Sequence, residues 1–540
     1  MKKVFSTIAV TAILLTLNLF LSACGSVDES GGGGRYGDEL RTYPPESIFQ
    51  FSVNSNEPIA LTTEEYELAD ATTNGEHITE NEISPMVSVS VAQISVPLVL
   101  PNGMFLDETG VLWAWGNNGN GELGDGTTAH RYSPVVIMDS VRYVTGGASG
   151  MLVLQDDDTL WGWGHNFLGQ LGDGTTERRI APVKLMDSVA KVISLGLRDA
   201  TFVLQNDGTL WGWGITAFDG VFGESSIDRI IYPVKIMDSV VEVFADGDIF
   251  ALRNDNSLWA LGVHWRWRVE HYYPINIMND VKTVLSSHTH QFAVHLDGSL
   301  WDLNMSHLWS EPERGIVPIR IMDSGVDVMV LTGSIWWTYG GELRPPQIAP
   351  SFFVLQNDRS LWAWGENGYG QLGDGTTEYR NYPVKIMEDV ESIQIGVDSI
   401  NVILTDGSLW AWGGNKTGLV GDGTTEQRFS PVQIMDSVVS VNRAANVGGR
   451  TFDSIFVVQE DGSLWAWGFN QDGQLGDGTR ECRTTPVRIM DSVQYVVTTG
   501  FSTFAMQADG SVWAWGINSF GNLGDGTTER RLRPVRITFH

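Results

Sequence analysis

Cysteine is nearly absent from this chain of 540 residues, which contains only Cys24 and Cys482. Two cysteines so far apart do not form the disulfide framework of a small secreted domain. The fold must therefore be stabilised by a buried core, and 540 residues with 42% apolar composition are sufficient for one. Cys482 stands at a variable loop position, and we interpret it as a residue without a catalytic role rather than as a nucleophile.

Basic side chains are also scarce. The chain has 34 lysines and arginines against 65 aspartates and glutamates, a formal net charge of −31. Such an excess of negative charge repels the phosphates of nucleic acid and the anionic face of a bilayer. We therefore predict no nucleic-acid partner, and no binding to an anionic membrane surface through the body of the protein.

Recognisable catalytic motifs are missing as well. The sequence contains no Gly-x-Ser-x-Gly, no His-Glu-x-x-His and no phosphate-binding glycine loop. His288 and His290 would share one strand face, where two imidazoles can bind a metal, but no carboxylate pattern completes that site. We predict no catalytic residue, no metal site and no cofactor. A non-enzymatic role is favoured, and enzymatic activity stays open.

The sequence is dominated by one repeated motif. The copy that begins at Leu160 reads Leu-Trp-Gly-Trp-Gly, continues with Gly-Gln-Leu-Gly-Asp-Gly-Thr at 169–175, and reaches Pro182-Val183. A fixed period of this length indicates one supersecondary unit copied many times. There are nine copies, and their first tryptophans are Trp113, Trp161, Trp211, Trp259, Trp301, Trp362, Trp410, Trp465 and Trp513.

Each copy has the pattern of four short strands. We predict strands at 192–193, 201–205 and 209–213, and a fourth at 182–186 with proline at its first position. Asn206-Asp207-Gly208 is typical of the hairpin turn between two of them. Four short strands in a period of about fifty residues are the layout of a propeller blade. The fold class is therefore all-β.

The repeated residues can be explained by structural roles. Trp113 and Trp115 alternate with a small residue and fall on one strand face, where they can be buried between neighbouring blades. Asp173 and Thr175 are expected to hydrogen-bond their own loop backbone. Aspartates in such loops are also candidate calcium ligands, but each loop lacks the alternating aspartates of an EF-hand, so turn stabilisation is favoured. Six copies keep this loop, with Asp125, Asp173, Asp374, Asp422, Asp477 and Asp525.

These residues resemble the regulator of chromosome condensation repeat family. The pattern Asp-Gly-Ser-Leu-Trp-Ala-Trp-Gly, then Gly-Gln-Leu-Gly-Asp-Gly-Thr and Pro-Val, is legible from Asp461 to Val487. The resemblance covers roughly Met104 to Phe539 and implies a β-propeller, usually of seven blades. Copies four and five, at Trp259 and Trp301, lack the Gly-Asp-Gly-Thr loop. They are either true blades of a nine-bladed ring or irregular copies beside a seven-bladed one.

The two ends of the array bear on ring closure. The last copy ends at Pro534 to Ile537, apparently one strand into a new blade, and the first begins before Met104, after the valine-rich stretch Val87 to Leu100. The two ends are therefore candidates for one shared blade, which would remove the exposed edges.

The N-terminus has the pattern of an export signal. Two lysines precede an apolar run from Val4 to Leu21, and small residues follow. The ending Leu-Ser-Ala-Cys resembles a bacterial lipobox, which implies removal of residues 1–23 and diacylation of Cys24. Two acyl chains suffice for stable anchoring. An ordinary secretory signal and an uncleaved anchor are the alternatives.

The rest of the chain divides into two parts. Residues 24–85 are rich in glycine and acidic residues, which is typical of a flexible tether. Residues 86–540 are predicted to form the β-propeller domain. The predicted location is extracytoplasmic, at a bacterial cell membrane, with the bilayer contacted through acylated Cys24.

The favoured function is a membrane-anchored binding scaffold for a protein or a cell-surface glycan, because repeat scaffolds are mostly binding platforms. The alternative is a secreted polysaccharide hydrolase or lyase, which needs carboxylates converging from different blades. The family's name-giver binds chromatin and promotes nucleotide exchange on a small GTPase. We disfavour both roles here, because a lipidated, exported and acidic chain would not meet chromatin or a cytosolic GTPase.

Overall fold

The computed structural model describes the chain from Gln93 onward, with gaps. The described residues are 93–95, 102–147, 150–194, 200–215, 229–246, 248–262, 274–286, 291–303, 318–323, 326–331, 338–339, 342–343, 351–396, 399–444, 453–498 and 501–539. The predicted signal peptide at 1–23, Cys24 and the tether at 24–85 lie outside them, as do His288 and His290.

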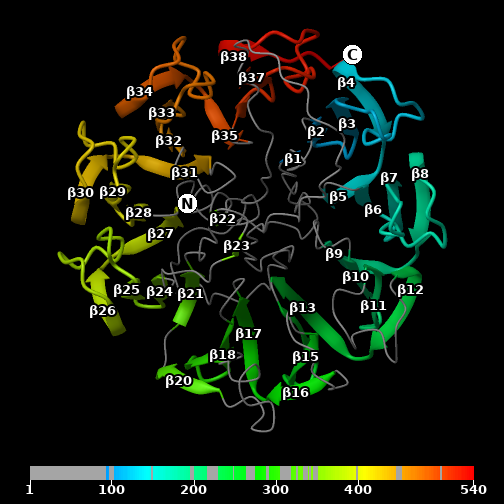
Figure 1. Ribbon diagram of the computed structural model, residues 1–540, viewed down its shortest axis with the longest axis horizontal. Helices are drawn as coiled ribbons and strands as arrows, with labels where there is room; N and C mark the ends of the chain where they lie inside the picture. The colour runs from blue at the N-terminus through cyan, green and yellow to red at the C-terminus, as the bar shows by residue number, and fades with distance from the viewer. Residues whose placement is uncertain are drawn as a thin grey trace, which may run out of the picture.

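Nine four-stranded antiparallel sheets surround a central axis as the blades of a propeller (Figure 1). Blades one to three contain β1 (Gln93–Ser95), β2 (Asn102–Leu106), β3 (Leu112–Gly116), β4 (Arg131–Met138); β5 (Val141–Gly147), β6 (Gly150–Gln155), β7 (Leu160–Gly164), β8 (Arg179–Met186); and β9 (Val189–Ser194), β10 (Ala200–Gln205), β11 (Leu210–Ile215), β12 (Arg229–Met237). Blades four to six contain β13 (Val240–Asp246), β14 (Asp248–Arg253), β15 (Leu258–Gly262), β16 (Ile275–Met278); β17 (Val281–Ser286), β18 (Gln291–His295), β19 (Leu300–Asp302), β20 (Ile319–Met322); and β21 (Val326–Leu331), β24 (Ser351–Gln356), β25 (Leu361–Gly365), β26 (Arg380–Met387). Blades seven to nine contain β27 (Val390–Ile395), β28 (Ser399–Leu404), β29 (Leu409–Gly413), β30 (Arg428–Met435); β31 (Val438–Ala444), β32 (Ser454–Gln459), β33 (Leu464–Gly468), β34 (Arg483–Met490); and β35 (Val493–Thr498), β36 (Ser502–Gln507), β37 (Val512–Gly516), β38 (Arg531–Arg536). A small hairpin of β22 (Thr338–Tyr339) and β23 (Glu342–Leu343) lies between β21 and β24 in sequence.

The all-β class and the count of nine copies are confirmed. Copies four and five form four-stranded sheets like the others, β13 to β16 and β17 to β20. The alternative of a seven-bladed ring with irregular copies is therefore wrong. These two copies keep the apolar strand pattern but lack the Gly-Asp-Gly-Thr sequence and the second tryptophan.

The proline of the fourth strand is not at its first position. β8 begins at Arg179, and Pro182 lies inside it. Gly164 pairs with Arg179 and Gly162 with Val183, so the ladder contains a bulge at the proline. Because β8 is an outer edge strand and the bulge interrupts pairing, no ladder N–H is lost there.

The predicted shared blade is also wrong. β38 completes the sheet that begins with β35, and β1 to β4 form a complete sheet of their own. One copy makes one blade, because the strand after each Trp-x-Trp strand is that blade's own outer strand. In Figure 1 the last blade lies beside the first.

Side chains close the ring between blade nine and blade one. Trp115 packs with Phe504 and Leu523 of blade nine, and its indole Nε1 donates a 2.9 Å hydrogen bond to Asn522 O. Phe539, beyond the last strand, contacts Phe105 with ring centroids 4.9 Å apart. Closure thus uses the same packing as the other junctions.

The core lies between blades, and the second tryptophan of each pair is its centre. Trp467 is fully buried and donates from Nε1 to Leu419 O of the preceding blade at 2.9 Å. Six junctions contain this bond, from Trp115, Trp163, Trp213, Trp412, Trp467 and Trp515. In blades four and five leucines, Leu261 and Leu303, occupy the position.

The first tryptophan of each pair has a different role. Trp465 shares a strand face with Trp467 and packs against the same cluster, as predicted, but it is only half-buried. Its Nε1 donates to Ser463 Oγ within the same blade at 3.0 Å. Of the two rings expected to be buried between blades, the second is therefore fully enclosed and the first only partly.

Candidate functional site

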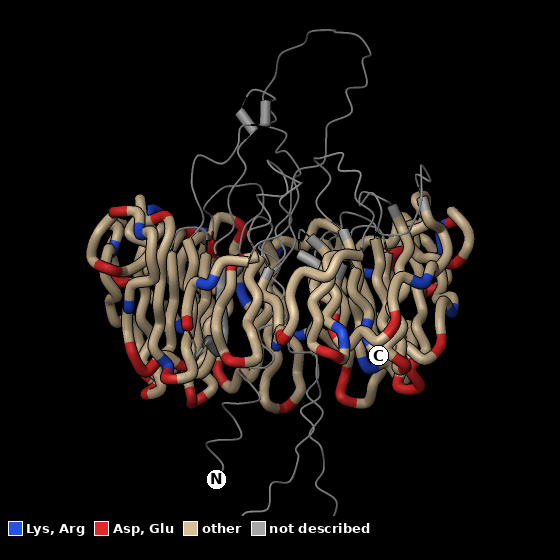
Figure 2. The backbone as a smooth tube through the Cα atoms, turned by 90° about the horizontal axis from the view of Figure 1, so that it is seen from below, with Lys and Arg blue, Asp and Glu red and all other residues tan. Residues whose placement is uncertain are grey.

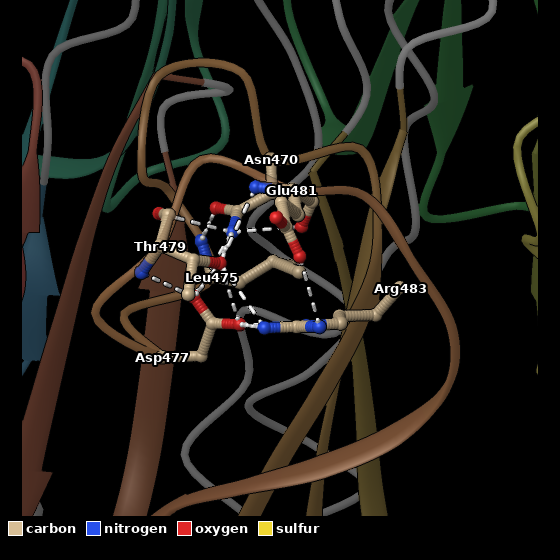
Figure 3. Close-up of polar contacts among 6 residues, drawn as sticks. All are labelled: Asn470, Leu475, Asp477, Thr479, Glu481 and Arg483. Atoms are coloured by element: carbon tan, nitrogen blue, oxygen red, sulfur yellow. Dashed lines mark hydrogen bonds and ion pairs between the residues drawn. The ribbon is translucent and has the colours of Figure 1, made fainter.

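The most repeated polar site is the Gly-Asp-Gly-Thr loop. In blade eight Asp477 accepts hydrogen bonds from the backbone N–H of Thr479 at 2.9 Å and from its hydroxyl at 2.8 Å. Arg483 donates to the other carboxylate oxygen from Nε at 2.7 Å (Figure 3). The side chain of Asp477 is only 7% exposed. Both carboxylate oxygens are thus engaged within the loop.

A buried asparagine organises the same loop. Asn470 donates from Nδ2 to Asp477 Oδ1 at 3.1 Å and to Glu481 O at 3.1 Å. Its Oδ1 accepts the N–H of Leu475 at 3.0 Å. One side chain thus connects both ends of the loop (Figure 3). Asparagine fits this position because its amide is at once donor and acceptor.

Each of the six loops also hydrogen-bonds to the next blade. Gly478 N donates to Leu532 O of blade nine at 2.8 Å. Gly476 has φ +82°, and a Cβ there would lie 2.7 Å from Trp515 Nε1. The backbone therefore approaches the neighbouring indole more closely than any side chain permits.

Sequence reasoning found part of this site. The hydrogen bond from Thr175 N to Asp173 is confirmed, at 3.0 Å. The asparagine and the arginine were missed, although both recur at fixed offsets from the aspartate. The six sets are Asn118–Asp125–Arg131, Asn166–Asp173–Arg179, Asn367–Asp374–Arg380, Asn415–Asp422–Arg428, Asn470–Asp477–Arg483 and Asn518–Asp525–Arg531.

These contacts explain the electrostatics of the loops. Partial burial raises the pKa of the Asp477 carboxyl, but hydrogen bonds from Thr479 and Arg483 outweigh it and hold the pKa below its ordinary value. The carboxylate is therefore ionised and neutralised by its arginine. Within the described part of the chain, no three His, Cys, Asp or Glu side chains are grouped closely enough to hold a metal ion.

A second series of aspartates lies in the hairpin turns. The Ser463 hydroxyl and N–H donate to Asp461 and lower the pKa of its carboxyl. Acidic residues line the edges of the ring in Figure 2. Every blade has one such aspartate, so these carboxylates encircle the ring rather than converge: Asp107, Asp157, Asp207, Asp255, Asp297, Asp358, Asp406, Asp461 and Asp509.

These lowered pKa values predict a pH dependence. A carboxyl whose pKa is lower in the folded state stabilises the fold above its unfolded pKa of about 3.9, and that stabilisation is lost as the pH falls through the folded pKa. We expect the melting temperature to be nearly constant from about pH 8 to pH 5 and to fall steeply below about pH 4. Asp477→Asn should melt lower at neutral pH and show a shallower acid decline in calorimetry. An equally steep decline would mean that the loop carboxylate does not contribute.

One polar cluster breaks the repetition. Arg443 on β31 and Asp453 before β32 form an ion pair of 2.9 Å whose side chains are 2% and 3% exposed. Arg443 also donates to Ser399 O at 2.8 Å and to Asn401 Oδ1 at 3.2 Å in blade seven. The guanidinium lies over Gly396, where a Cβ would be 2.0 Å from its central carbon. The cluster joins blades seven and eight and was not anticipated, because nothing local pairs these residues.

The other residues singled out in the sequence contribute little here. Cys482 is an exposed free thiol. Of the histidines between 264 and 307 only His295 is described, with Nδ1 3.3 Å from Asp297 Oδ1. In the residues that the structure covers, we find no helix long and apolar enough to cross a membrane.

Fold and loops together define an all-β, nine-bladed propeller whose repeated loop contacts join neighbouring blades. A family model for the regulator of chromosome condensation (RCC1) repeat matches residues 109–154, 358–398, 406–446, 461–505 and 509–540. Repeats of the RCC1 type therefore occupy these five regions of the chain. The matched copies are one, six, seven, eight and nine.

Similar solved structures share the same limited identity. Human WBSCR16 is 16% identical, with 79% of this chain and 94% of that chain covered and a TM-score of 0.38. Prp20p from Saccharomyces cerevisiae is 16% identical, with 81% and 88% covered and a TM-score of 0.40. Yeast RCC1 (Prp20) bound by Kap60 is 15% identical, with 88% and 91% covered and a TM-score of 0.40. Prp20p is described by its binding properties to Gsp1p and histones, and identities this low do not transfer such partners to this chain.

Proposed function

We propose that this RCC1-repeat propeller is a non-enzymatic binding scaffold that engages a protein or a glycan at a bacterial cell surface. An RCC1-type propeller supports a binding scaffold or an exchange-factor-like role. The observation that favours the scaffold is the use of the repeated carboxylates. In six copies the loop aspartate is bonded to threonine and arginine, and in all nine blades the hairpin aspartate is held in its own turn. Among the described residues this repeated chemistry is structural and includes no converging catalytic set, which is typical of a binding platform.

Charge restricts the partner. The net charge of −31 and the hairpin carboxylates around the ring give a negative potential that repels polyanions, attracts basic ligands and leaves neutral ones unaffected. We therefore propose a neutral or basic partner surface, and no nucleic acid.

The scaffold hypothesis is tested by capture on intact cells. The purified full chain would be incubated with cells and with a glycan array, and bound material would be identified by mass spectrometry. Saturable binding of one protein or glycan class, without turnover, supports the proposal. Turnover of a polysaccharide substrate without retention of a ligand would contradict it and favour the hydrolase or lyase alternative.

The proposed anchor gives a separate prediction. Cys24→Ala should abolish acylation, because the thiol is the acylated group, and should leave the protein unprocessed or released from the membrane. Detergent-phase partitioning of wild type and variant measures this directly. Cys482→Ala is the matched control and should partition like the wild type. A Cys24→Ala protein that still partitions as a mature-size lipoprotein would rule out acylation at this residue.

A further inference from the structure

The outer strand of each blade is an unpaired sheet edge. The strands β4, β8, β12, β16, β20, β26, β30, β34 and β38 stand at one end of their sheets, and among the described residues no further strand pairs with them. They face outward around the ring (Figure 1). An exposed edge of this kind can add a strand from another chain, and natural proteins protect such edges with proline and with charged side chains, lysine above all.

The position opposite the first tryptophan is polar in eight of the nine outer strands. In blade two Trp161 pairs with Lys184, whose ammonium lies 2.5 Å from Asp187 Oδ1. The corresponding residues of the other seven strands are Lys235, Asn276, Arg320, Lys385, Gln433, Arg488 and Arg536. A proline lies in or just before each outer strand as well. These eight edges therefore combine a proline with a polar side chain.

Blade one is the exception. Trp113 pairs with Val136 on β4, and Val136 is 53% exposed. Asp139, three residues further on, accepts a hydrogen bond from Ser140 Oγ at 3.3 Å instead of the base that Asp187 meets in blade two. Because residues that pair across strands lie on the same sheet face, Val136 continues the carbon surface of the half-buried Trp113 outward, where other blades end it with a polar group.

The apolar surface continues at the other end of β4. Tyr132 is 43% exposed and lies against the blade-nine loop, where a Cβ on Gly521 would be 2.3 Å from Tyr132 Cδ1. Phe520, the residue before Gly521, is 50% exposed. Arg131 is the only charged residue of β4 and is neutralised by Asp125 at 2.6 Å. This edge thus offers exposed apolar side chains and no net charge of its own.

We propose that β4 is a docking edge to which a partner protein adds one extended, uncharged and mainly apolar strand, with side chains against Val136, Tyr132 and Phe520. This inference rests on the proposed scaffold function and names the partner class and the surface that receives it. In strand addition the main-chain hydrogen bonds supply affinity, and the side chains beside the edge supply selectivity.

Charge decides between the possible occupants of this edge. Because Arg131 and Asp125 neutralise each other, β4 matches an uncharged strand, whereas a basic segment is drawn to the hairpin carboxylates instead. Two copies of a chain with net charge −31 repel each other, so a second copy of this protein is the less favoured occupant.

Fluorescence polarisation with the full chain tests the inference. The probe is a labelled peptide of alternating threonine and valine, compared with the same peptide carrying N-methylated valines and with a peptide of alternating lysine and valine. The neutral peptide should bind with a stoichiometry of one. The N-methylated peptide should not bind, because methylation removes N–H groups that an added strand needs.

Val136→Lys gives β4 the side chain that blade two has at Lys184. The variant should fold normally, because six other outer strands have a lysine or arginine there, and should weaken binding of the neutral peptide by about tenfold or more. Tyr132→Ala should weaken it by about two- to fivefold. Gln433→Lys is the matched control, since it adds the same charge at the equivalent position of blade seven, and should leave the affinity unchanged.

Several outcomes would overturn the docking edge. They are no binding of the neutral peptide, equal binding of the N-methylated peptide, an equal loss in Gln433→Lys, and a preference for the lysine–valine peptide that Val136→Lys does not change. A wild-type dimer in sedimentation equilibrium that Val136→Lys converts to monomer would assign the edge to a second copy instead.

Intact cells distinguish failure of this inference from failure of the scaffold. If cells retain Val136→Lys as well as the wild type, the docking edge fails and the scaffold stands. If cells retain neither protein while the neutral peptide still binds in a Val136-dependent way, the scaffold at the cell surface fails and the docking edge stands.

Discussion

Trp467→Ala is expected to lower the free energy of unfolding by about 3–5 kcal/mol, as a fully buried large aromatic residue does when truncated. The ring is enclosed between blades seven and eight with residues such as Leu409 and Val457. Its removal leaves a cavity and takes the donor from Leu419 O. Denaturant-induced unfolding followed by circular dichroism, with calorimetry, measures the loss.

Trp465→Ala is the matched control for this prediction. The two tryptophans lie on one face of β33, but Trp465 is half-buried and bonded within its own blade. We expect a clearly smaller loss, because less apolar surface returns to water. If Trp465→Ala destabilises as much as Trp467→Ala, the packing between blades is not the main source of stability.

Asp453→Ala is expected to destabilise the protein by about 3–5 kcal/mol, because it leaves the Arg443 guanidinium buried without its counter-ion. The pair is 2.9 Å apart and nearly fully enclosed. The effect should exceed that of Asp125→Ala or any other single loop aspartate, since each loop arginine remains about 30% exposed and can be solvated, as Arg380 is.

A double variant separates the charge from the packing. Arg443→Met with Asp453→Ala removes both charges and should recover much of the stability lost in Asp453→Ala, because an apolar side chain carries no desolvation cost. Unfolding midpoints of the three proteins decide the matter. A double variant no more stable than Asp453→Ala would show that Arg443 acts through its bonds to Ser399 and Asn401 instead.

Features that are formed within one repeat copy were predictable from the sequence. The strand pattern, the Asp-Gly hairpins and the aspartate–threonine loop are local, and nine repetitions average out the irregularities of any one copy. Which tryptophan is fully buried was not predictable in this way, because both lie on the same strand face and only the neighbouring blade decides which indole is enclosed.

Features that join different copies escaped prediction. Arg443 reaches Ser399 only because blades seven and eight lie side by side. The phase of the repeat was misread at Pro534, since alternation along a strand does not tell which sheet the strand completes. Asn470 and Arg483 were detectable in principle, because both recur at a constant offset from the loop aspartate.

The substitution of leucine for the second tryptophan gives the ring uneven mechanical strength. Leu261 and Leu303 supply no indole donor, so two adjacent junctions lack the cross-blade bond that six others contain. A closed ring under radial load parts at its weakest junctions, and local opening follows the lowest local stability. Amide exchange should therefore be fastest in β13 to β20, and a pulling force applied across the ring should first separate these blades while the arc from β27 through β38 to β12 stays joined.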